Sequence, residues 1–428
     1  MKKITALAAL CLLGFTRPDG PKPPVFDDET RAYAIPTLTR SPKGDALLSW
    51  TEKDAQGLVH FYFALSNDQG KTFSGKKLIY AAPGIGTSRL MRPRVLFKKD
   101  GTMVAVFANR VGETPTVAAK PADAHAGHGT EKPASAAPAP SRPRDSQIVY
   151  ASSKDGGQTW TAPQPVHSDR TAGVTTPGVT TPAVMRGFFD ATVLANGEVA
   201  VAFLHDIAGQ AHSRDLRLVV SKGEGFGPEK IIEPFVCDCC NVSLLVDASG
   251  ALHVYYRENK DNIRDIDQMI STDHGATFSK PEPLYADGWK LNGCPHSGPT
   301  SSRFGQSALI AWYSGTATNS PGIRVVTQEG KRLFVLDDPS AKNAWLLPAP
   351  KTSSVLLWEQ ASEKGETPVT AIGYRSISPD AVSETRWIQD SENATNASGL
   401  VVGDQMLVAY EVKRPSKLNA LKISTVGL

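Results

Sequence analysis

Short apolar runs, each introduced by a tight turn, recur along most of the chain. In the clearest copies a Gly is followed within a few residues by a β-rich run that ends in an aromatic residue. These copies are SPKGDALLSW (41–50), KKDGTMVAVF (98–107), LANGEVAVAF (194–203) and DASGALHVYY (247–256), with weaker versions at 303–313, 349–359 and 401–411. Such turns between apolar runs are typical of β-hairpins. The seven copies are spaced by roughly 45–60 residues once one insert is left out, and such a period indicates a repeat architecture.

A second repeat has the pattern S-x-D-x-G-x-T-[WF]. Its three copies are SNDQGKTF (66–73), SKDGGQTW (153–160) and STDHGATF (271–278), and each follows a β-rich run. The carboxylates of Asp68, Asp155 and Asp273 can accept backbone N–H bonds across a turn, and the Gly allows a positive φ. The final aromatic residue can then pin the turn to the core. The pattern therefore predicts a structural hairpin turn.

Together the two repeats predict an all-β fold. Repeats of about 50 residues with four short strands each are typical of a β-propeller, whose blades stack radially around a channel. Seven inner-strand signals favour seven blades, and six blades are the alternative if the last segment only completes the sixth. The last blade, residues 392–428, is short by one strand, which residues 24–30 could supply to close the ring.

Composition supports a globular β-rich body and excludes several kinds of protein. Of the 428 residues, 40% are apolar and 21% charged, whereas 36 Gly and 31 Pro argue against a mostly helical chain. The formal net charge is only +3, so a nucleic-acid partner is not expected. After residue 20 no apolar run reaches the roughly 18 residues of a transmembrane helix. The oligomeric state stays open.

Residues 1–20 have the features of a secretory signal peptide. MKK is a cationic start, ITALAALCLLGF is apolar, and TRPDGPKPP breaks any helix. The sequence therefore predicts export to the periplasm or the extracellular space. Lipid anchoring through Cys11 is less favoured, because Leu10 stands where a small residue is expected. Residues 21–428 are predicted to form one propeller domain with a disordered insert at about 112–145, which lacks large apolar side chains.

The S-x-D-x-G-x-T-[WF] segments resemble the Asp-box, or BNR, repeats of sialidases and related propellers. The resemblance covers about residues 30–390, and it implies a sialidase-like propeller in which the boxes are structural. Boxes of this kind also occur in propellers that are not enzymes, so the resemblance concerns the fold more than the activity. It implies six blades if this chain follows the sialidases in that respect.

The sialidase catalytic motifs are degenerate in this sequence. The family has an Arg in an R-I-P motif, and here Ala34 precedes Ile35 and Pro36. Asn241 or Val242 stands where the resemblance places a Glu, and residues 343–345 contain no Tyr where the nucleophile would fall. Neither Asn nor Val can act as a base. We therefore expect sialidase hydrolysis to be lost or altered, with the ligand a glycan or another anion; an exo-α-sialidase-type glycoside hydrolase is the alternative.

Candidate ligand-binding residues lie near the predicted starts of inner strands or at positions implied by the resemblance. Arginines could hold a carboxylate, and the polar side chains could orient a sugar. The candidates are Arg92, Arg186, Asp190, Asp238, Asn241, Arg257, His296 and Arg324.

Four cysteines and a histidine form the last candidate group. Cys237, Cys239 and Cys240 precede the fourth predicted inner strand, and Cys294 and His296 precede the fifth. An even number of cysteines in an exported chain favours disulfides. The crowded C-x-C-C spacing would force one strained bridge, so two alternatives stay open. One is a soft-metal site for copper or zinc, and the other is a redox-active thiol pair.

Overall fold

The computed structural model describes residue 26 and residues 28–113, 145–168, 184–208, 210, 213–316, 320–350, 353–362, 369–416 and 418–428. The predicted signal peptide and nearly all of the predicted insert lie outside these residues. The described residues contain no α-helix, and none of their elements is a helix able to cross a membrane.

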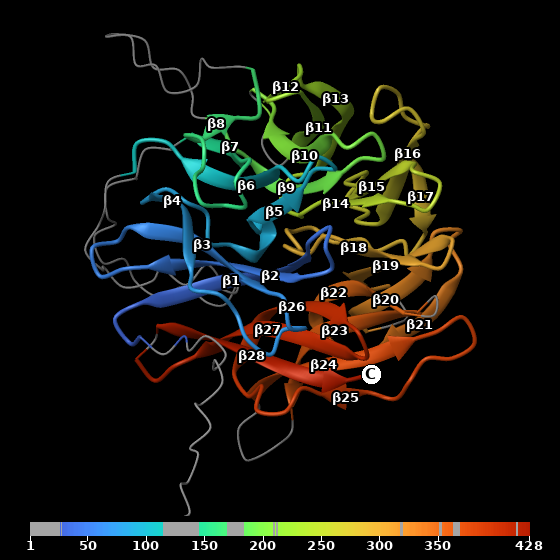
Figure 1. The fold of residues 1–428 in the computed structure, drawn as a ribbon. Helices are drawn as coiled ribbons and strands as arrows, with labels where there is room; N and C mark the ends of the chain where they lie inside the picture. Colours follow the sequence, from blue (N-terminus) through green and yellow to red (C-terminus); the bar gives the residue numbers. More distant parts are fainter. Residues whose placement is uncertain are drawn as a thin grey trace, which may run out of the picture.

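Seven antiparallel sheets are arranged in a ring, so the fold is a seven-bladed β-propeller (Figure 1). The seven-blade prediction is confirmed and the six-blade alternative is wrong. Blades 1 and 2 are formed by β1 (Ala32–Arg40), β2 (Ala46–Lys53), β3 (Val59–Ser66), β4 (Lys77–Ala82), β5 (Arg94–Phe97), β6 (Met103–Arg110), β7 (Ser146–Ser153) and β8 (Gln164–Pro165). A 3-10 turn, η1 (Arg89–Met91), joins them.

Blades 3 and 4 follow the same order, except that two short segments share the outermost position of blade 3. Both pair with its third strand. The strands are β9 (Arg186–Val193), β10 (Val199–Asp206), β11 (Ser213–Lys222), β12 (Gly225–Phe226), β13 (Lys230–Cys237), β14 (Ser243–Val246), β15 (Leu252–Arg257), β16 (Ile266–Ser271) and β17 (Glu282–Tyr285).

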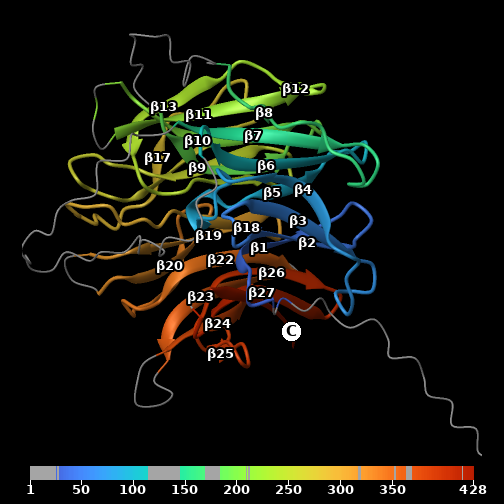
Figure 2. The ribbon, with the colours of Figure 1, turned by 90° about the vertical axis from the view of Figure 1, so that its left-hand side faces the viewer.

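Blades 5 and 6 have four strands each and blade 7 has three. They comprise β18 (Thr300–Phe304), β19 (Ser307–Ser314), β20 (Gly322–Thr327), β21 (Arg332–Leu336), β22 (Lys342–Ala349), β23 (Ser353–Ser362), β24 (Val369–Ile377), β25 (Arg386–Trp387), β26 (Ala394–Val402), β27 (Gln405–Lys413) and β28 (Asn419–Gly427). Figure 2 shows the first and last blades side by side.

The turns that begin the first repeat are hairpins between the first two strands of a blade, as predicted. Gly44, Gly101, Gly197 and Gly250 have φ between +86° and +92°, a region that side chains disfavour. The strand after each turn is almost completely buried. The core is divided into seven apolar clusters, and each cluster lies between two neighbouring blades. The hydrophobic effect therefore holds blade to blade.

The ring closes between blades 1 and 7 without a shared strand. Phe26 packs in the cluster that joins the two blades, and Arg414 donates to the backbone carbonyls of Phe26 and Asp28. The described part of residues 24–30 is coil and turn. The prediction that it supplies a fourth strand to blade 7 is therefore wrong for these residues, because side-chain packing and hydrogen bonds make the closure.

The Asp boxes form the turns between the third and fourth strands of blades 1, 2 and 4. In blade 1, Asp68 accepts from the Thr72 backbone at 2.9 Å, from its hydroxyl at 2.6 Å and from the Ser66 hydroxyl at 2.8 Å. These bonds, the one from the Thr72 hydroxyl first, lower the pKa of Asp68 to about 2. Asp155 and Asp273 make the same set of bonds.

Each box also touches the blade before it. A Cβ added to Gly157 would lie 2.2 Å from the Phe63 ring, and one added to Gly70 would lie 2.2 Å from Leu407. The box glycine therefore allows a positive φ and a close approach between blades.

Candidate functional site

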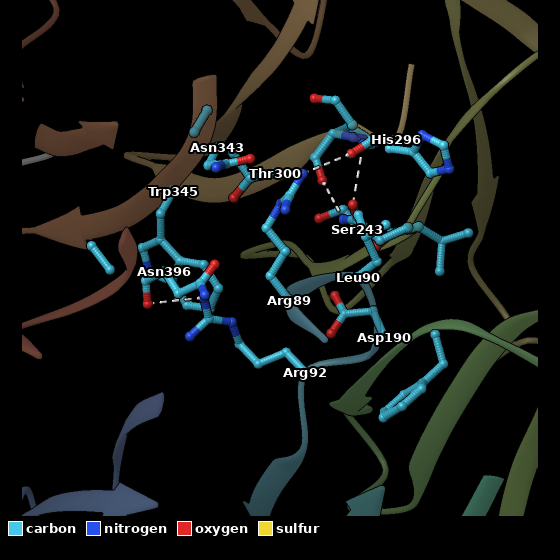
Figure 3. A pocket seen from close by; sticks show the side chains of 18 of the residues that line it. Arg89, Leu90, Arg92, Asp190, Ser243, His296, Thr300, Asn343, Trp345 and Asn396 are labelled. Carbon is cyan, nitrogen blue, oxygen red and sulfur yellow. Dashed lines mark hydrogen bonds between the residues drawn. The ribbon is translucent and has the colours of Figure 1, made fainter. Parts of the chain in front are cut away.

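A pocket opens at the end of the propeller where the innermost strands begin (Figure 3). Because strands alternate in direction, the Asp boxes lie at the opposite end. Blades 2 to 7 and η1 supply its lining, which is mostly polar. The residues used below are Arg89, Arg92, Arg94, Phe189, Asp190, Asn241, Ser243, His296, Thr300, Asn343, Trp345 and Asn396.

A repeated β-bulge shapes this end of the molecule. In the innermost strands of blades 1, 3, 6 and 7, two residues oppose one aromatic residue of the next strand. The first residue of each bulge has a positive φ, between 51° and 57°, although none is glycine; these residues are Ile35, Phe188, Asn343 and Asn396. Bulges of this kind bend a strand and redirect its side chains, and strained φ values gather at functional sites.

Hydrogen bonds between neighbouring blades fix the residues that follow the bulges. Asp190 Oδ2 accepts the Leu244 N–H at 2.9 Å, and Ser398 Oγ accepts the Leu38 N–H at 3.0 Å. In blade 5, Thr300 Oγ1 accepts the Leu346 N–H at 3.2 Å. Each acceptor therefore ties its blade to the innermost strand of the next blade, which holds the pocket rigid.

Three arginines enter the pocket from blade 2 and the turn before it, but they differ in their partners. Arg94 forms an ion pair with Asp190, with Nε 2.9 Å and Nη2 2.7 Å from Oδ1. Arg89 donates to the His296 backbone carbonyl at 3.3 Å. Among the described residues no carboxylate forms an ion pair with Arg89 or Arg92. The lining therefore holds three arginines and one aspartate, and the buried carboxyl groups of Glu359 and Glu411 lie behind it and interact electrostatically with Arg89 and Arg92.

Arg92 is buried at the side of the pocket. It donates to the backbone carbonyls of Pro36 and Asn396, and its guanidinium lies 4.7 Å from the centre of the Trp345 ring. Burial first, and then the charge of Arg94, lower the pKa of Arg92 to about 9. A buried, charged guanidinium is unfavourable without a counter-charge. Binding an anion beside Arg92 would therefore stabilise it.

Two buried glutamates support the wall near Asn396. Glu359 accepts the Asn396 N–H at 2.6 Å, and Glu411 accepts from the Asn396 side-chain amide at 2.9 Å. Glu359 also accepts from the Asn343 amide at 2.7 Å. Burial raises the pKa of both carboxyl groups. Both glutamates thus position asparagines, and neither lines the pocket.

The structure brings some of the predicted ligand-binding residues together and places others elsewhere. Arg92, Asp190, Asn241 and His296 line the pocket. The remaining four, Arg186, Asp238, Arg257 and Arg324, are not among its lining residues.

Arg257 and Arg324 are held inside the protein. Arg257 is 1% exposed and donates to the carbonyls of Ser297 at 2.7 Å and Tyr313 at 2.8 Å. Arg324 is also 1% exposed and lies 3.6 Å from an Asp287 oxygen. The role of Arg257 and Arg324 in ligand binding stays a prediction, because neither residue lines the pocket.

Sequence reasoning missed Asn343, Trp345 and Asn396 as site residues. All three belong to bulged segments, and the aromatic residue opposite each bulge ends one of the repeated β-rich runs. That aromatic end was the available signal, because it marks which two residues of the preceding strand are forced out of register.

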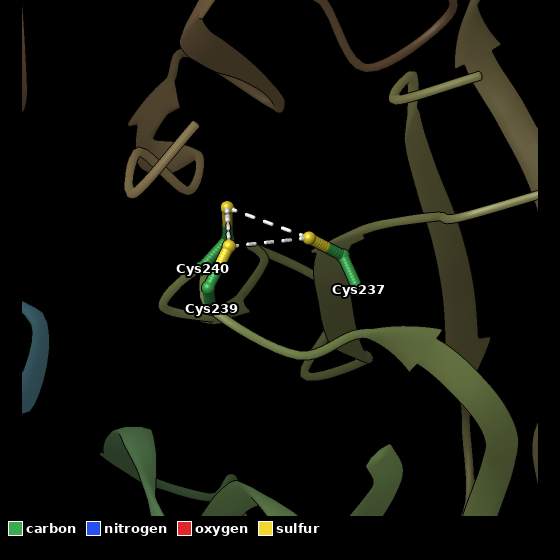
Figure 4. A group of neighbouring side chains, drawn as sticks. All are labelled: Cys237, Cys239 and Cys240. Carbon is green, nitrogen blue, oxygen red and sulfur yellow. Dashed lines mark hydrogen bonds between the residues drawn. The ribbon is translucent and has the colours of Figure 1, made fainter. Parts of the chain in front are cut away.

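The predicted Cys/His group adjoins this pocket through His296, and Figure 4 shows its three buried cysteines, Cys237, Cys239 and Cys240. The sulfurs of Cys237, Cys239 and Cys240 lie 3.7, 3.7 and 3.9 Å from one another, and all three residues are buried. The donor atoms of Cys239, Cys294 and His296 lie within 4.8 Å of one another. The group could therefore hold a metal ion.

The four described cysteines are free in the structure. Hydrogen bonds with Cys239 and then with Cys240 lower the pKa of Cys237, and Arg264 donates to its sulfur at 3.4 Å. The predicted disulfides are not seen among these residues, and they stay a prediction for an oxidised state of the protein.

Comparison with known proteins agrees with this architecture. A family model described as a BNR repeat-like domain matches residues 134–288. None of the curated proteins matches the sequence. A protein of unknown function from Dyadobacter fermentans has a similar structure, with a TM-score of 0.53, 13% identity and coverage of 94% of this chain and 97% of that chain.

Two glycan-related structures are also similar. An ulvan lyase of polysaccharide lyase family PL25, bound to -[GlcA(1-4)Rha3S]-, has a TM-score of 0.53 and 14% identity, covering 94% of this chain and 95% of that chain. The intramolecular trans-sialidase from Ruminococcus gnavus has a TM-score of 0.46 and 14% identity, covering 84% of this chain and 98% of that chain. The chain is a seven-bladed β-propeller in which residues 134–288 match the BNR repeat-like domain. The likeness concerns the fold alone.

Proposed function

We propose that the axial pocket binds an acidic saccharide outside the cytoplasm. The observation that carries this proposal is the pair of guanidinium groups, on Arg89 and Arg92, that have no ion-pair partner among the described residues. An arginine fork matches the geometry of a carboxylate or sulfate and binds it through charge-assisted hydrogen bonds. The proposed location rests on the predicted signal peptide.

The rest of the lining suits a sugar. Trp345 and Phe189 offer apolar surface, and Asn241, Asn343 and Ser243 offer donors and acceptors that match hydroxyl groups. The ulvan lyase with a similar fold is bound to a saccharide that carries GlcA and Rha3S units. That complex supports an acidic saccharide as the class of ligand to be tested first.

Binding with sialidase hydrolysis lost or altered agrees with the residues in the pocket. Asn241 and Val242 line it where the resemblance implies a Glu, and the segment Asn343, Ala344 and Trp345 lines it where the resemblance implies a Tyr. An exo-α-sialidase remains the alternative. Release of fluorophore from a fluorogenic sialoside at a rate that Arg92→Gln abolishes would favour the enzyme.

The direct test is calorimetry with matched saccharides. Oligosaccharides that contain uronate, sulfate or sialate are compared with neutral ones of the same length. We expect binding of at least one acidic series, no measurable binding of the neutral series, and affinity that falls as salt is added. Arg89→Gln should weaken binding about tenfold, which corresponds to about 1.4 kcal/mol.

Arg386→Gln is the matched control, because Arg386 is exposed on β25, away from the pocket lining. It should bind as the unchanged protein does. Equal loss in both variants would mean that the affinity comes from general surface charge, and the proposal would then be abandoned.

A second function, binding of copper or zinc, is supported by the distances within the cysteine group. A tetrahedral ion with metal–sulfur bonds of about 2.3 Å needs sulfurs about 3.8 Å apart. The observed separations are 3.7 to 3.9 Å. Thiolates also suit Cu(I). Metal analysis of protein purified without an affinity-tag metal or chelator tests this function, and Cys240→Ser should remove the ion.

A further inference from the structure

The sulfurs of Cys237, Cys239 and Cys240 could supply three of the four ligands of a tetrahedral metal ion. The fourth coordination position would then be open. The triangle of sulfurs has edges of 3.7, 3.7 and 3.9 Å, so its centre lies about 2.2 Å from each sulfur. An ion with bonds of about 2.3 Å therefore sits just off this plane and has room for a fourth ligand. Structural zinc sites are four-coordinate and closed, so the source of the fourth ligand decides what the site does.

We infer that the segment Cys294–His296, between blades 4 and 5, supplies that fourth ligand to a zinc ion and thereby fastens one wall of the axial pocket. This inference rests on the proposed metal function. Both candidate donors lie near one of the three sulfurs, because the donor atoms of Cys239, Cys294 and His296 are within 4.8 Å of one another. The segment must shift to bring one of them equally close to the sulfurs of Cys237 and Cys240. Either side chain completes a known zinc donor set, Cys₄ or Cys₃His.

The charged groups beside the cluster include one arginine and one carboxylate, because Arg264 contacts Cys237 and the Cys294 thiol donates to Asp238 Oδ1 at 3.8 Å. Three thiolates and Zn²⁺ leave one net negative charge, and a fourth thiolate would leave two. Arg264 contacts the Cys237 sulfur at 3.4 Å, so a guanidinium already faces the excess charge. Each thiol that binds releases its proton to water, and neither the ion nor the sulfur changes oxidation state.

The same segment is part of the pocket wall. The His296 backbone carbonyl accepts from Arg89 at 3.3 Å, and the Gly298 N–H donates to Asn241 Oδ1 at 3.1 Å. Asn241 in turn follows Cys240 in the chain. The two chain segments that meet in this wall therefore lead directly to proposed metal ligands, Cys240 in one segment and His296 in the other. In Figure 3 the His296 ring points away from Arg89 and Arg92, so it can bind metal while its backbone serves the pocket.

The experiment compares zinc affinity in four proteins: unchanged chain, Cys294→Ser, His296→Gln and the double variant. Each is reduced and handled without oxygen, then titrated with zinc against a chromophoric chelator. We expect the double variant to bind about a hundredfold more weakly, and one single variant to account for most of the loss. Cobalt(II) replacing zinc should give the intense visible bands of a tetrahedral site in the unchanged chain and weaker bands in the double variant.

Hydrogen exchange supplies a readout that does not depend on affinity. Zinc should slow amide exchange across residues 290–299 in the unchanged chain and leave it unaltered in the double variant. Equal zinc affinity in all four proteins would overturn the inference and leave the metal function standing. Absence of zinc binding by the reduced, unchanged chain would overturn both.

Disulfides give a different result in the same preparation. Bridged cysteines become reactive toward a thiol reagent only after a reductant is added, whereas zinc-bound thiolates become reactive after a chelator alone. Release by reductant only, with no zinc uptake afterwards, would overturn the inference.

Discussion

The two ends of the propeller use polar side chains and positive φ values in opposite ways. At the Asp-box end, the residues that need a positive φ for close contact between blades are glycines such as Gly70 and Gly157. Each box carboxylate there is used by its own turn. At the pocket end, bulges place non-glycine residues such as Asn343 and Asn396 at positive φ, and Arg89 and Arg92 lack ion pairs among the described residues.

This difference distinguishes two kinds of polar group. The box carboxylates are used by the fold itself, whereas Arg89 and Arg92 are available to a ligand. Backbone strain and unbalanced buried charge lower the stability of the folded protein. They therefore persist mainly where a function requires them. At the box end each carboxylate is paired within its own turn and the closely packed positions are glycines, although Gln69 and His274 also have a positive φ there. Conspicuous repetition therefore identifies the scaffold, and the irregular positions at the pocket end identify the candidate site.

Arg257 provides the largest expected effect, because it belongs near the pocket end yet is fully engaged by the protein. Arg257→Ala removes the guanidinium that donates to the buried Arg264 carbonyl and to the part-buried carbonyls of Ser297 and Tyr313. We expect a loss of about 3 kcal/mol or more in the free energy of unfolding, since each unsatisfied buried group costs about 1–3 kcal/mol. Urea denaturation measures it. A loss below about 1 kcal/mol would mean that the fold depends little on Arg257, which would then resemble Arg89 and Arg92 as an arginine available to a ligand.

Gly157 and Gly156 make a matched pair at the box end. Both have positive φ, 78° and 69°, but an added Cβ meets Phe63 only at Gly157. Gly157→Ala should therefore destabilise the protein by about 1–3 kcal/mol more than Gly156→Ala, which is the usual effect of overpacking. Saccharide binding by folded protein should be the same in both variants. Weaker binding in Gly157→Ala alone would contradict the division between the two ends.

Arg89→Gln should show the reverse behaviour. Its free energy of unfolding should change by less than about 0.5 kcal/mol, as expected for a half-buried side chain with one long hydrogen bond, although its ligand affinity falls. Thermal and urea unfolding measured beside the calorimetry would show this. Strong destabilisation would mean that the Arg89–His296 contact holds the fold together.

Lowering the pH should have the smallest effect on stability, because it acts on the Asp boxes only by protonating their carboxylates. The pKa of Asp68 is lowered to about 2, and hydrogen bonds to Thr159 and Thr277 also lower the pKa values of Asp155 and Asp273. A carboxylate with a lowered pKa in the folded state stabilises above its unfolded pKa and loses that contribution as pH falls. Box-derived stability should thus be complete above about pH 4 and decline toward pH 2.

The matched comparison for acid is the triple variant Asp68→Asn, Asp155→Asn and Asp273→Asn. Its denaturant midpoint should be lower at pH 6 and should fall less between pH 4 and pH 2.5. Parallel curves for the two proteins would show that other carboxylates cause the acid sensitivity.

Much of the fold could be predicted from sequence because its cause is local. A Gly at positive φ followed by a largely buried strand marks six of the seven hairpins, and the copy at 349–359, which has no Gly, is recognised by its apolar run. The sequence indicates that residues 24–30 help to close the ring, but the contacts by which they do so could not be predicted, because Phe26 and Arg414 lie almost 390 positions apart. Only tertiary structure makes them neighbours.

The candidate site was only partly predictable for a related reason. Arg92 and Asp190 lie close to strand starts, and the topology brings strand starts together. Whether an arginine is available depends on nearby backbone carbonyls, as Arg257 illustrates, and loop conformation sets their positions. Trp345 enters the pocket through a bulge, which shifts the simple alternation on which sequence reasoning relies.

The closure between blades 1 and 7 also determines the order in which the molecule can assemble. Six of the seven interfaces join blades that are consecutive in the chain, so they can form as each blade is synthesised. The seventh brings together Ile35 and Glu411, which are 376 residues apart, and it carries the entropy of closing nearly the whole chain into a loop. Arg92 bridges this seam by donating to Pro36 in blade 1 and Asn396 in blade 7. The pocket is therefore completed only at the last step of folding, and an anion bound at Arg92 would slow the reopening of the ring.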